Sequence, residues 1–153
     1  MNCGALIHDS PAPLLANCTL GEAAEHLARA PVQSLPVVTA EGHYVGVFGL
    51  DELLARIVPR VAIAGDMTAN LRFISDDLSD LHARFRAIAQ HEVKAWCNRQ
   101  AAFVRPGTPA IEALQLFCRG HSILPVVADD GKLCGLLSPS MAIRVISSQP
   151  DNS

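Results

Sequence analysis

The chain has 153 residues, of which 50% are hydrophobic and 18% charged, with a formal net charge of −3. This balance supports a hydrophobic core, and it argues against a disordered chain and against the basic surface of a nucleic-acid-binding protein. No apolar run reaches the roughly 20 residues of a membrane helix, and no secretory signal is recognisable. The five Cys are scattered and include no Cys-x-x-Cys pair, which argues against a disulfide framework and fits a reducing compartment. We therefore expect a cytoplasmic protein.

A short apolar strand at residues 14–16 opens the first predicted unit. A helix is expected next, because Thr19 and Glu22 have the Thr-x-x-Glu spacing of a capping box. A β-hairpin follows, in which the apolar runs 35–38 and 44–48 flank a polar turn that contains Gly42. A second helix, from residue 50 to about residue 58, completes the unit.

An insert of about 40 residues separates this unit from the next apolar strand. Ser75 or Asp77 is placed to cap a helix that runs to about Glu92. Its apolar residues are spaced 3, 4 and 3 apart, which predicts a narrow stripe that docks on the module or on a second chain. These residues are Leu78, Leu81, Phe85 and Ile88.

A second unit repeats the same order of elements. Residues 102–104 form the first strand, and Thr108 is expected to cap a helix whose first residue is Pro109. The apolar runs 123–127 and 133–137 form the hairpin, and the last helix spans about 140–147. A constant offset of 89 residues gives eleven identities over 46 positions, among them Leu-Pro-Val-Val at 35–38 and 124–127. This duplication predicts a pseudo-symmetric pair of units.

The order and spacing of these motifs resemble the cystathionine-β-synthase (CBS) domain family. The resemblance implies an α/β (α+β) fold, a tandem CBS pair or Bateman module of two β-α-β-β-α repeats with pseudo-two-fold symmetry and a helical insert. It places the first repeat at 10–58, the insert at 59–94, the second repeat at 95–147 and a disordered tail at 148–153. It further implies a homodimeric regulatory or sensing module, not an enzyme, that requires no cofactor and acts on an unknown regulated protein.

In this family the clefts between repeats commonly bind AMP, ADP, ATP or S-adenosylmethionine as regulatory ligands. Carried over position by position, the ligand-binding candidates of the first copy are Thr19, Leu35, Pro36, Val37, Gly49 and Glu52. Those of the second copy are Thr108, Leu124, Pro125, Val126, Ser138 and Met141.

Both copies depart from the family pattern Gly-hydrophobic-hydrophobic-Ser/Thr-x-x-Asp, in which the Asp binds the ribose hydroxyls. Gly49 and Glu52 replace the Ser/Thr and the Asp in the first copy, whereas the second copy keeps Ser138 and carries Met141 instead of the Asp. A lost charge-assisted hydrogen bond costs roughly 1.5–3 kcal/mol, so the first copy is expected to form the better cleft. The basic residue that often precedes Leu-Pro is absent too, since Ser34 and Ile123 stand there.

Two alternatives remain open from the sequence. If the cleft binds a ligand, Asp51 can replace Glu52 as the ligand residue when the helix begins one residue later. If it does not, Glu52 is a solvated first-turn residue that the helix dipole favours. The whole module then serves as a structural or protein-interaction unit with degenerate clefts. Cys118 and His121 give only two of the ligands that a zinc site needs, and no nucleophile elbow, phosphate loop or HExxH motif is present, so no metal site or catalytic residue is predicted.

Overall fold

The computed structural model describes residues 1–58 and 78–148. The elements of the first repeat are β1 (Leu14–Leu15), α1 (Leu20–Arg29), β2 (Ser34–Val38), β3 (Tyr44–Gly49) and α2 (Leu50–Ile57). Those of the second are α5 (Ala110–Cys118), β4 (Leu124–Val127), β5 (Leu133–Leu137) and α6 (Pro139–Ser148). Helix α4 (Leu78–Ile88) and two short 3₁₀ helices, η1 (Cys3–Leu6) and η2 (Val93–Ala95), lie outside the two units. The predicted α+β fold of two repeats is confirmed.

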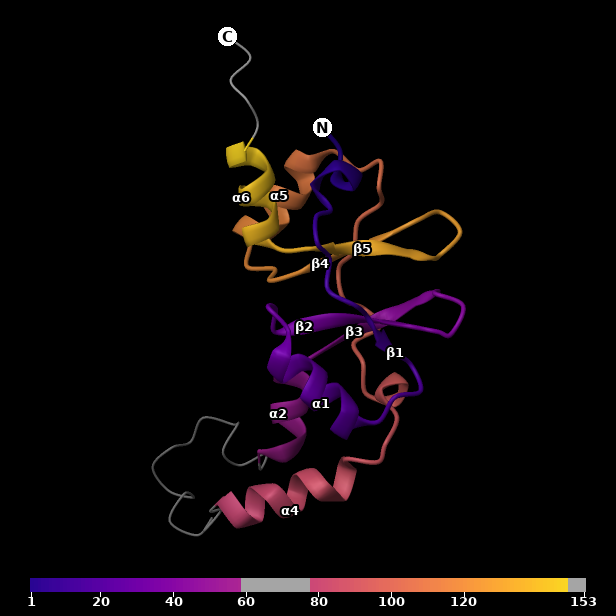
Figure 1. Ribbon diagram of the computed structural model, residues 1–153, viewed down its shortest axis with the longest axis vertical. Helices are drawn as coiled ribbons and strands as arrows, with labels where there is room; N and C mark the ends of the chain where they lie inside the picture. Colours follow the sequence, from indigo (N-terminus) through magenta and orange to yellow (C-terminus); the bar gives the residue numbers. More distant parts are fainter. Residues whose placement is uncertain (59–77, 149–153) are drawn as a thin grey trace.

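The two sheets lie against each other at the centre of the molecule, and the helices lie on their outer sides (Figure 1). One sheet has the order β1-β2-β3 and the other contains β4 and β5. Ile123 and Leu136 of the second repeat join the buried cluster of the first repeat around Leu35 and Phe48. Because each sheet covers the apolar face of the other, the duplication provides the burial that one small unit lacks.

The first strand of the second repeat is shorter than predicted. In the first repeat β1 pairs with β2 in parallel, with Leu14 opposite Val37. In the second, only an isolated parallel bridge joins Val104 to Val126. The next residue, Arg105, donates its N–H to Thr108 Oγ1 at 3.0 Å, whereas its counterpart Ala16 in the first repeat donates to the carbonyl oxygen of Val38.

The two predicted helix caps have different outcomes. Thr19 caps α1 as expected, since its Oγ1 accepts the N–H of Glu22 at 3.1 Å. The prediction for Thr108 is wrong, because α5 begins at Ala110 after Pro109 and has no side-chain cap. The N–H of Ala110 instead donates to the carbonyl oxygen of Met1 at 3.1 Å, so a distant backbone group satisfies the start of this helix.

The insert helix docks on its own module. The expected start of this helix at Ser75 or Asp77 lies outside the described residues, and its described end is at Ile88 rather than near Glu92. Phe85 and Ile88 pack against the core of the first repeat. Helix α4 therefore covers the first repeat, next to α2, through the C-terminal end of its apolar stripe (Figure 1).

The segment that precedes each repeat packs on the other repeat. Cys3 and Leu6 of η1 are fully buried in the core of the second repeat, where the N–H of Cys3 donates to the carbonyl oxygen of Thr108 at 2.8 Å. Val93 of η2 is fully buried in the core of the first repeat, and its N–H donates to Cys18 O at 2.9 Å. These exchanged segments tie the two repeats together. No helix in the described ranges is long and apolar enough to cross a bilayer.

Candidate functional site: the cleft between the repeats

A cavity of about 350 Å³ lies between the two repeats, within the size range of small-molecule sites. The wall that the first repeat forms begins at the open end of the β2–β3 hairpin, where β2 starts and β3 ends. It continues onto the first turn of α2. The lining residues of the first repeat are Ser34, Val47, Asp51 and Glu52, and those of the opposite wall are Asn98, Gln100, Ala101, Ala102, Gly120, His121, Ser122 and Ile123. The cleft is therefore shared by both repeats.

Glu52 is the only predicted ligand residue among the described lining residues, and it also caps a helix. Its Oε2 accepts the N–H of Gly49 at 3.0 Å, which is the carboxylate half of a capping box, since Gly49 has no side chain to complete it. Asp51 is exposed and makes no hydrogen bond or ion pair to a described residue. Helix α2 begins at Leu50, so Asp51 faces the cleft without any shift of the helix start.

The charge of the cleft is negative. Asp51 and Glu52 line it, whereas none of its described lining residues is Lys or Arg. Arg99 lies between two lining residues in sequence, but its Nη2 donates to the carbonyl oxygen of Lys94 at 3.2 Å. His121, on the wall that the second repeat forms, is the one lining group in the described part that protonation would make positive.

The two Leu-Pro-Val strands do not line this cleft with their side chains. All six residues are less than 2% exposed and lie in the core: Leu35, Pro36, Val37, Leu124, Pro125 and Val126. A continuous apolar run is typical of a strand that is covered on both faces, and this burial keeps the side chains out of the cleft. Their contribution is to hold the residues at the strand ends, such as Ser34 and Ile123, at the edge of the cavity.

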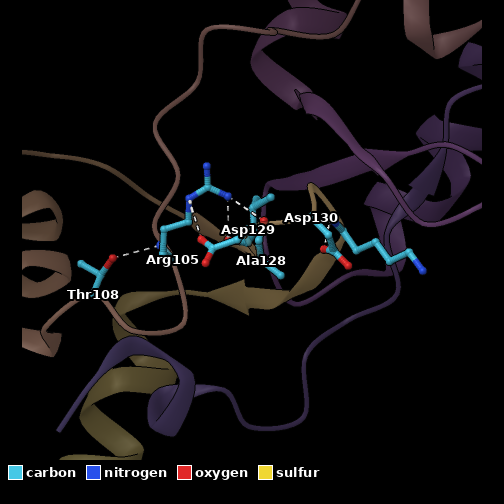
Figure 2. Close-up of polar contacts among 7 residues, drawn as sticks. Arg105, Thr108, Ala128, Asp129 and Asp130 are labelled. Atoms are coloured by element: carbon cyan, nitrogen blue, oxygen red, sulfur yellow. Dashed lines mark hydrogen bonds and ion pairs between the residues drawn. The ribbon is translucent and has the colours of Figure 1, made fainter.

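Neither predicted Thr lines the cleft, and both hydroxyls already accept a backbone hydrogen bond. Thr19 accepts from Glu22, as described above. Thr108 Oγ1 accepts the N–H of Arg105 at 3.0 Å, and the Arg105 guanidinium in turn donates to the carbonyl oxygen of Ala128 at 2.6 Å (Figure 2). Thr108 and Arg105 thus brace the turn between β4 and β5.

The corresponding residues of the second repeat are closed off from solvent. Ser138 is 4% exposed and Met141 7% exposed. The hydroxyl of Ser138 lies 3.1 Å from Ser140 Oγ and accepts the N–H of Met141 at 3.4 Å. At the offset of 89 residues, Ser140 and the apolar Met141 therefore stand where the first repeat presents the carboxylates of Asp51 and Glu52.

Sequence reasoning missed most of the lining residues. Ser34 drew notice only as a lost basic residue, and His121 only as a metal candidate. Within residues 1–58 and 78–148 no three His, Cys, Asp or Glu side chains lie close enough to hold a metal ion. His121 follows Gly120, whose positive φ of 105° ends α5 just before β4. A helix stop placed directly before a buried strand is the signal that marks this corner of the cleft.

Burial raises the pKa of three Cys thiols. This desolvation acts on Cys3, Cys18 and Cys97, and the neighbouring carboxylates of Glu112 and Glu22 add to it for Cys3 and Cys18. A raised pKa keeps a thiol protonated at neutral pH, which is the opposite of what a nucleophilic Cys requires.

Solved structures confirm the arrangement of the repeats. The CBS-pair protein CBSX2 from Arabidopsis thaliana has a TM-score of 0.71 and 22% identity, with 95% of this chain and 94% of that chain covered. A structure of CBSX2 in complex with AMP has a TM-score of 0.68 and 22% identity over 95% and 96% of the two chains. A CBS domain-containing protein of unknown function from Bacillus anthracis has a TM-score of 0.72 and 13% identity over 98% and 95%. At these identities the likeness shows the fold alone.

The sequence itself carries the family assignment. No curated protein matches the chain. The CBS-domain family model matches twice, at residues 3–59 and at residues 93–148, which together are well over half of the chain. This chain is a CBS-pair protein of the CBS-domain family.

Proposed function

We propose that the chain is a regulatory CBS pair, not an enzyme, that binds an adenosine-containing ligand in the cleft between its repeats. The observation that carries this proposal is the pair of carboxylates, Asp51 and Glu52, on the wall of a cavity of about 350 Å³. Carboxylates accept hydrogen bonds from the two ribose hydroxyls, and charge-assisted bonds of this kind are stronger than neutral ones. The AMP bound to CBSX2, a protein of the same fold, supports the choice of ligand.

The charge of the cleft favours one group of adenosine ligands. Two carboxylates repel a polyphosphate, and no Lys or Arg among the described lining residues offsets them. A ligand with a neutral or cationic group at the 5′ position avoids this repulsion. Among the ligands that the family resemblance implies, S-adenosylmethionine fits this requirement best, and ATP fits it least.

A ligand in this cleft acts by joining the two repeats. Asp51 belongs to the first repeat and His121 to the second, so a molecule that contacts both stabilises one relative position of the repeats over others. We propose that the chain acts as a cytoplasmic homodimer. The shift in the relative position of the repeats then reaches a regulated partner protein through the outer helices. The direction and size of this shift between relative positions of the repeats depend on the difference in the ligand's affinity for those positions.

Isothermal titration calorimetry of the full chain with S-adenosylmethionine, adenosine, AMP and ATP tests the proposal. We expect saturable binding of the first two, weaker binding of AMP, and the weakest binding of ATP. Asp51→Asn should weaken the binding of S-adenosylmethionine about tenfold, the value of one charge-assisted hydrogen bond. The absence of saturable binding of all four compounds up to about 1 mM, a free energy near −4 kcal/mol, would overturn it.

The burial of Met141 and Ser138 favours a second function, that of a structural or interaction module. In that case the chain forms a stable dimer whose melting temperature does not respond to any nucleotide, because only ligands that bind the native state raise it. A thermal-shift series combined with a mass measurement of the oligomer distinguishes the two functions.

A further inference from the structure

The first helix of each repeat has a row of three residues on its solvent side, and the two rows differ in chemistry. The row on α1 is charged and exposed, and consists of Glu22, Glu25 and Arg29. At the offset of 89 residues, the row on α5 consists of Ile111, Leu114 and Cys118. Spacings of 3 and 4 residues keep each row on one side of its helix. We call the second row the apolar stripe of α5.

The apolar stripe lies outside the core of its own repeat. The buried residues of α5 are Ala110 and Ala113, whereas Ile111 is 61% exposed and Cys118 is exposed as well. The fold does not require apolar side chains at these positions, because α1 carries charged ones at the corresponding positions. An apolar row on the outer side of a molecule, where α5 lies (Figure 1), is typical of a protein–protein contact.

Charges of both signs lie along the same helix. A groove of about 320 Å³ is lined by Glu112, Gln115, Leu116 and Arg119. Glu112 and Arg119 lie two helical turns apart, so a negative charge stands at one end of the groove and a positive charge at the other. Among the ion pairs of the described residues, none includes either side chain. Such a surface is complementary to a copy of itself that is rotated by 180°.

We infer that α5 packs against α5 of a second copy of this chain, antiparallel, around a two-fold axis near the middle of the helix. In this arrangement Ile111 faces Cys118 of the partner subunit. Glu112 pairs with Arg119 of the partner subunit, and the symmetry produces each contact twice. The inference rests on the proposed homodimer and names the surface that forms it.

The outer side of the first repeat does not offer an equivalent surface. Helix α4 lies next to α2, and the N–H of Gly21 in α1 donates to the carbonyl oxygen of Ala89, directly after α4, at 3.0 Å. A two-fold axis at the middle of the charged row of α1 would bring Glu25 next to Glu25 of the partner subunit, and like charges repel each other. The interface is therefore confined to the second repeat.

The small size of this interface sets the concentration at which the dimer forms. Helix α5 has nine residues, which makes it about 14 Å long and about 10 Å wide. One helix of this size covers much less than the roughly 800 Å² per partner that a standard interface buries. We therefore expect a dimer that dissociates on dilution, with a dissociation constant on the order of 10–100 μM.

Sedimentation velocity of the full chain between about 1 and 500 μM tests the interface, a range chosen to bracket that dissociation constant. The average mass should rise with concentration from 16.3 kDa towards twice that value. Ile111→Glu places a carboxylate in the apolar stripe, and Glu112→Arg places a positive charge opposite Arg119 of the partner subunit. Each should weaken dimerisation about tenfold or more. The double variant E112R/R119E exchanges the two charges, so its dimerisation should recover to that of the unsubstituted chain.

The control is Leu54→Glu, which adds the same charge at an apolar residue of the first repeat that is 53% exposed, and it should leave dimerisation unchanged. All variants are compared where circular dichroism shows them folded. A dimer that Ile111→Glu does not weaken, or that Leu54→Glu weakens equally, would overturn this interface and leave the proposed homodimer standing. A double variant that dimerises no better than Glu112→Arg would overturn it too. A chain that stays monomeric up to about 500 μM would remove the homodimer together with this inference, whereas calorimetry with S-adenosylmethionine decides ligand binding separately.

Discussion

The backbone N–H of Tyr44 donates to the carbonyl oxygen of Gly131 at 2.9 Å. The reciprocal bond runs from the N–H of Leu133 to the carbonyl oxygen of Gly42 at 3.0 Å. Tyr44 and Leu133 are 89 residues apart, as are Gly42 and Gly131, so each bond is the symmetry mate of the other. Two backbone hydrogen bonds therefore join the hairpins, in addition to the packing of their side chains. The offset visible in the sequence also relates the two repeats in space.

A second backbone contact between the repeats makes Gly46 sensitive to substitution. Val47 and Asn98 exchange two hydrogen bonds of 3.0 and 2.7 Å, and a Cβ on Gly46 would lie 2.6 Å from the carbonyl oxygen of Asn98. We expect Gly46→Ala to lower the free energy of unfolding by about 1–3 kcal/mol in urea denaturation. Gly107→Ala is the matched control, because no atom lies within 4 Å of its Cβ. Equal stability of the two variants would contradict the packing argument.

Removing the hydroxyl of Tyr44 should not destabilise the protein. This oxygen is buried and has no hydrogen-bond partner among the described residues, while the ring packs against Phe103 with centroids 5.7 Å apart. Phe keeps the ring and removes a polar group that burial disfavours. We expect Tyr44→Phe to leave the free energy of unfolding unchanged or to raise it by up to about 1 kcal/mol. A loss of stability in urea denaturation would show that the hydroxyl has a bonding partner in solution.

Stability at high pH should also depend on Tyr44. Desolvation by burial, with a smaller contribution from Cys97, raises the pKa of its phenol from the ordinary value of 10.0 to about 12. As the pH rises, the Tyr44 phenol therefore ionises in the unfolded chain before it ionises in the folded protein. The contribution of this phenol to the free energy of unfolding is fully present below pH 10 and is lost as the pH rises through about 12. Because the chain has a single Tyr, absorbance of the phenolate reports its titration directly.

The comparison for this pH dependence is between the native chain and Tyr44→Phe. The raised pKa values of the Cys3, Cys18 and Cys97 thiols also make the free energy of unfolding fall as the pH rises. Both proteins keep these thiols, so their effect is the same in the two. The difference in free energy of unfolding between the two proteins therefore isolates Tyr44. A difference that stays constant above pH 10, where the phenol of the unfolded chain ionises, would contradict the raised pKa of Tyr44.

The repeat and its hairpins were predictable because strands and turns depend on local patterns. Residues 35–38 and 124–127 are buried strands because they are continuous apolar runs, and Gly42 and Gly131 adopt positive φ of 89° and 87° in the turns. The exchange of η1 onto the second repeat was not predictable, since Cys3 and Leu6 share no identity with their counterparts at the offset of 89. Ser34 lies opposite Gly49 in the β2–β3 ladder, and this pairing was hidden for a different reason, because only the fold defines the register of the two strands.

Glu52 is expected to stabilise α2 independently of any ligand. Its Oε2 accepts the N–H of Gly49, which would otherwise lack a partner at the start of the helix. Glu52→Ala should lower the free energy of unfolding by about 0.5–2 kcal/mol, whereas Glu52→Gln keeps an acceptor at the same place and should lower it less. Asp51→Ala is the control, because Asp51 has no hydrogen bond to a described residue. An equal loss in Asp51→Ala and Glu52→Ala would indicate that helix-dipole interactions, and not the cap, account for the effect.

Met141 should matter for stability and not for ligand binding. Its side chain is 7% exposed in the second repeat, so Met141→Ala leaves a cavity and should lower the free energy of unfolding by about 2–4 kcal/mol. Ile143→Ala on the same helix is the matched control, because Ile143 is 62% exposed and its truncation should cost less than about 0.5 kcal/mol. The affinity for S-adenosylmethionine should be the same in both variants, since neither residue lines the cleft that contains Asp51. A weaker affinity of Met141→Ala, measured where that variant is fully folded, would show that the second repeat takes part in binding through this residue.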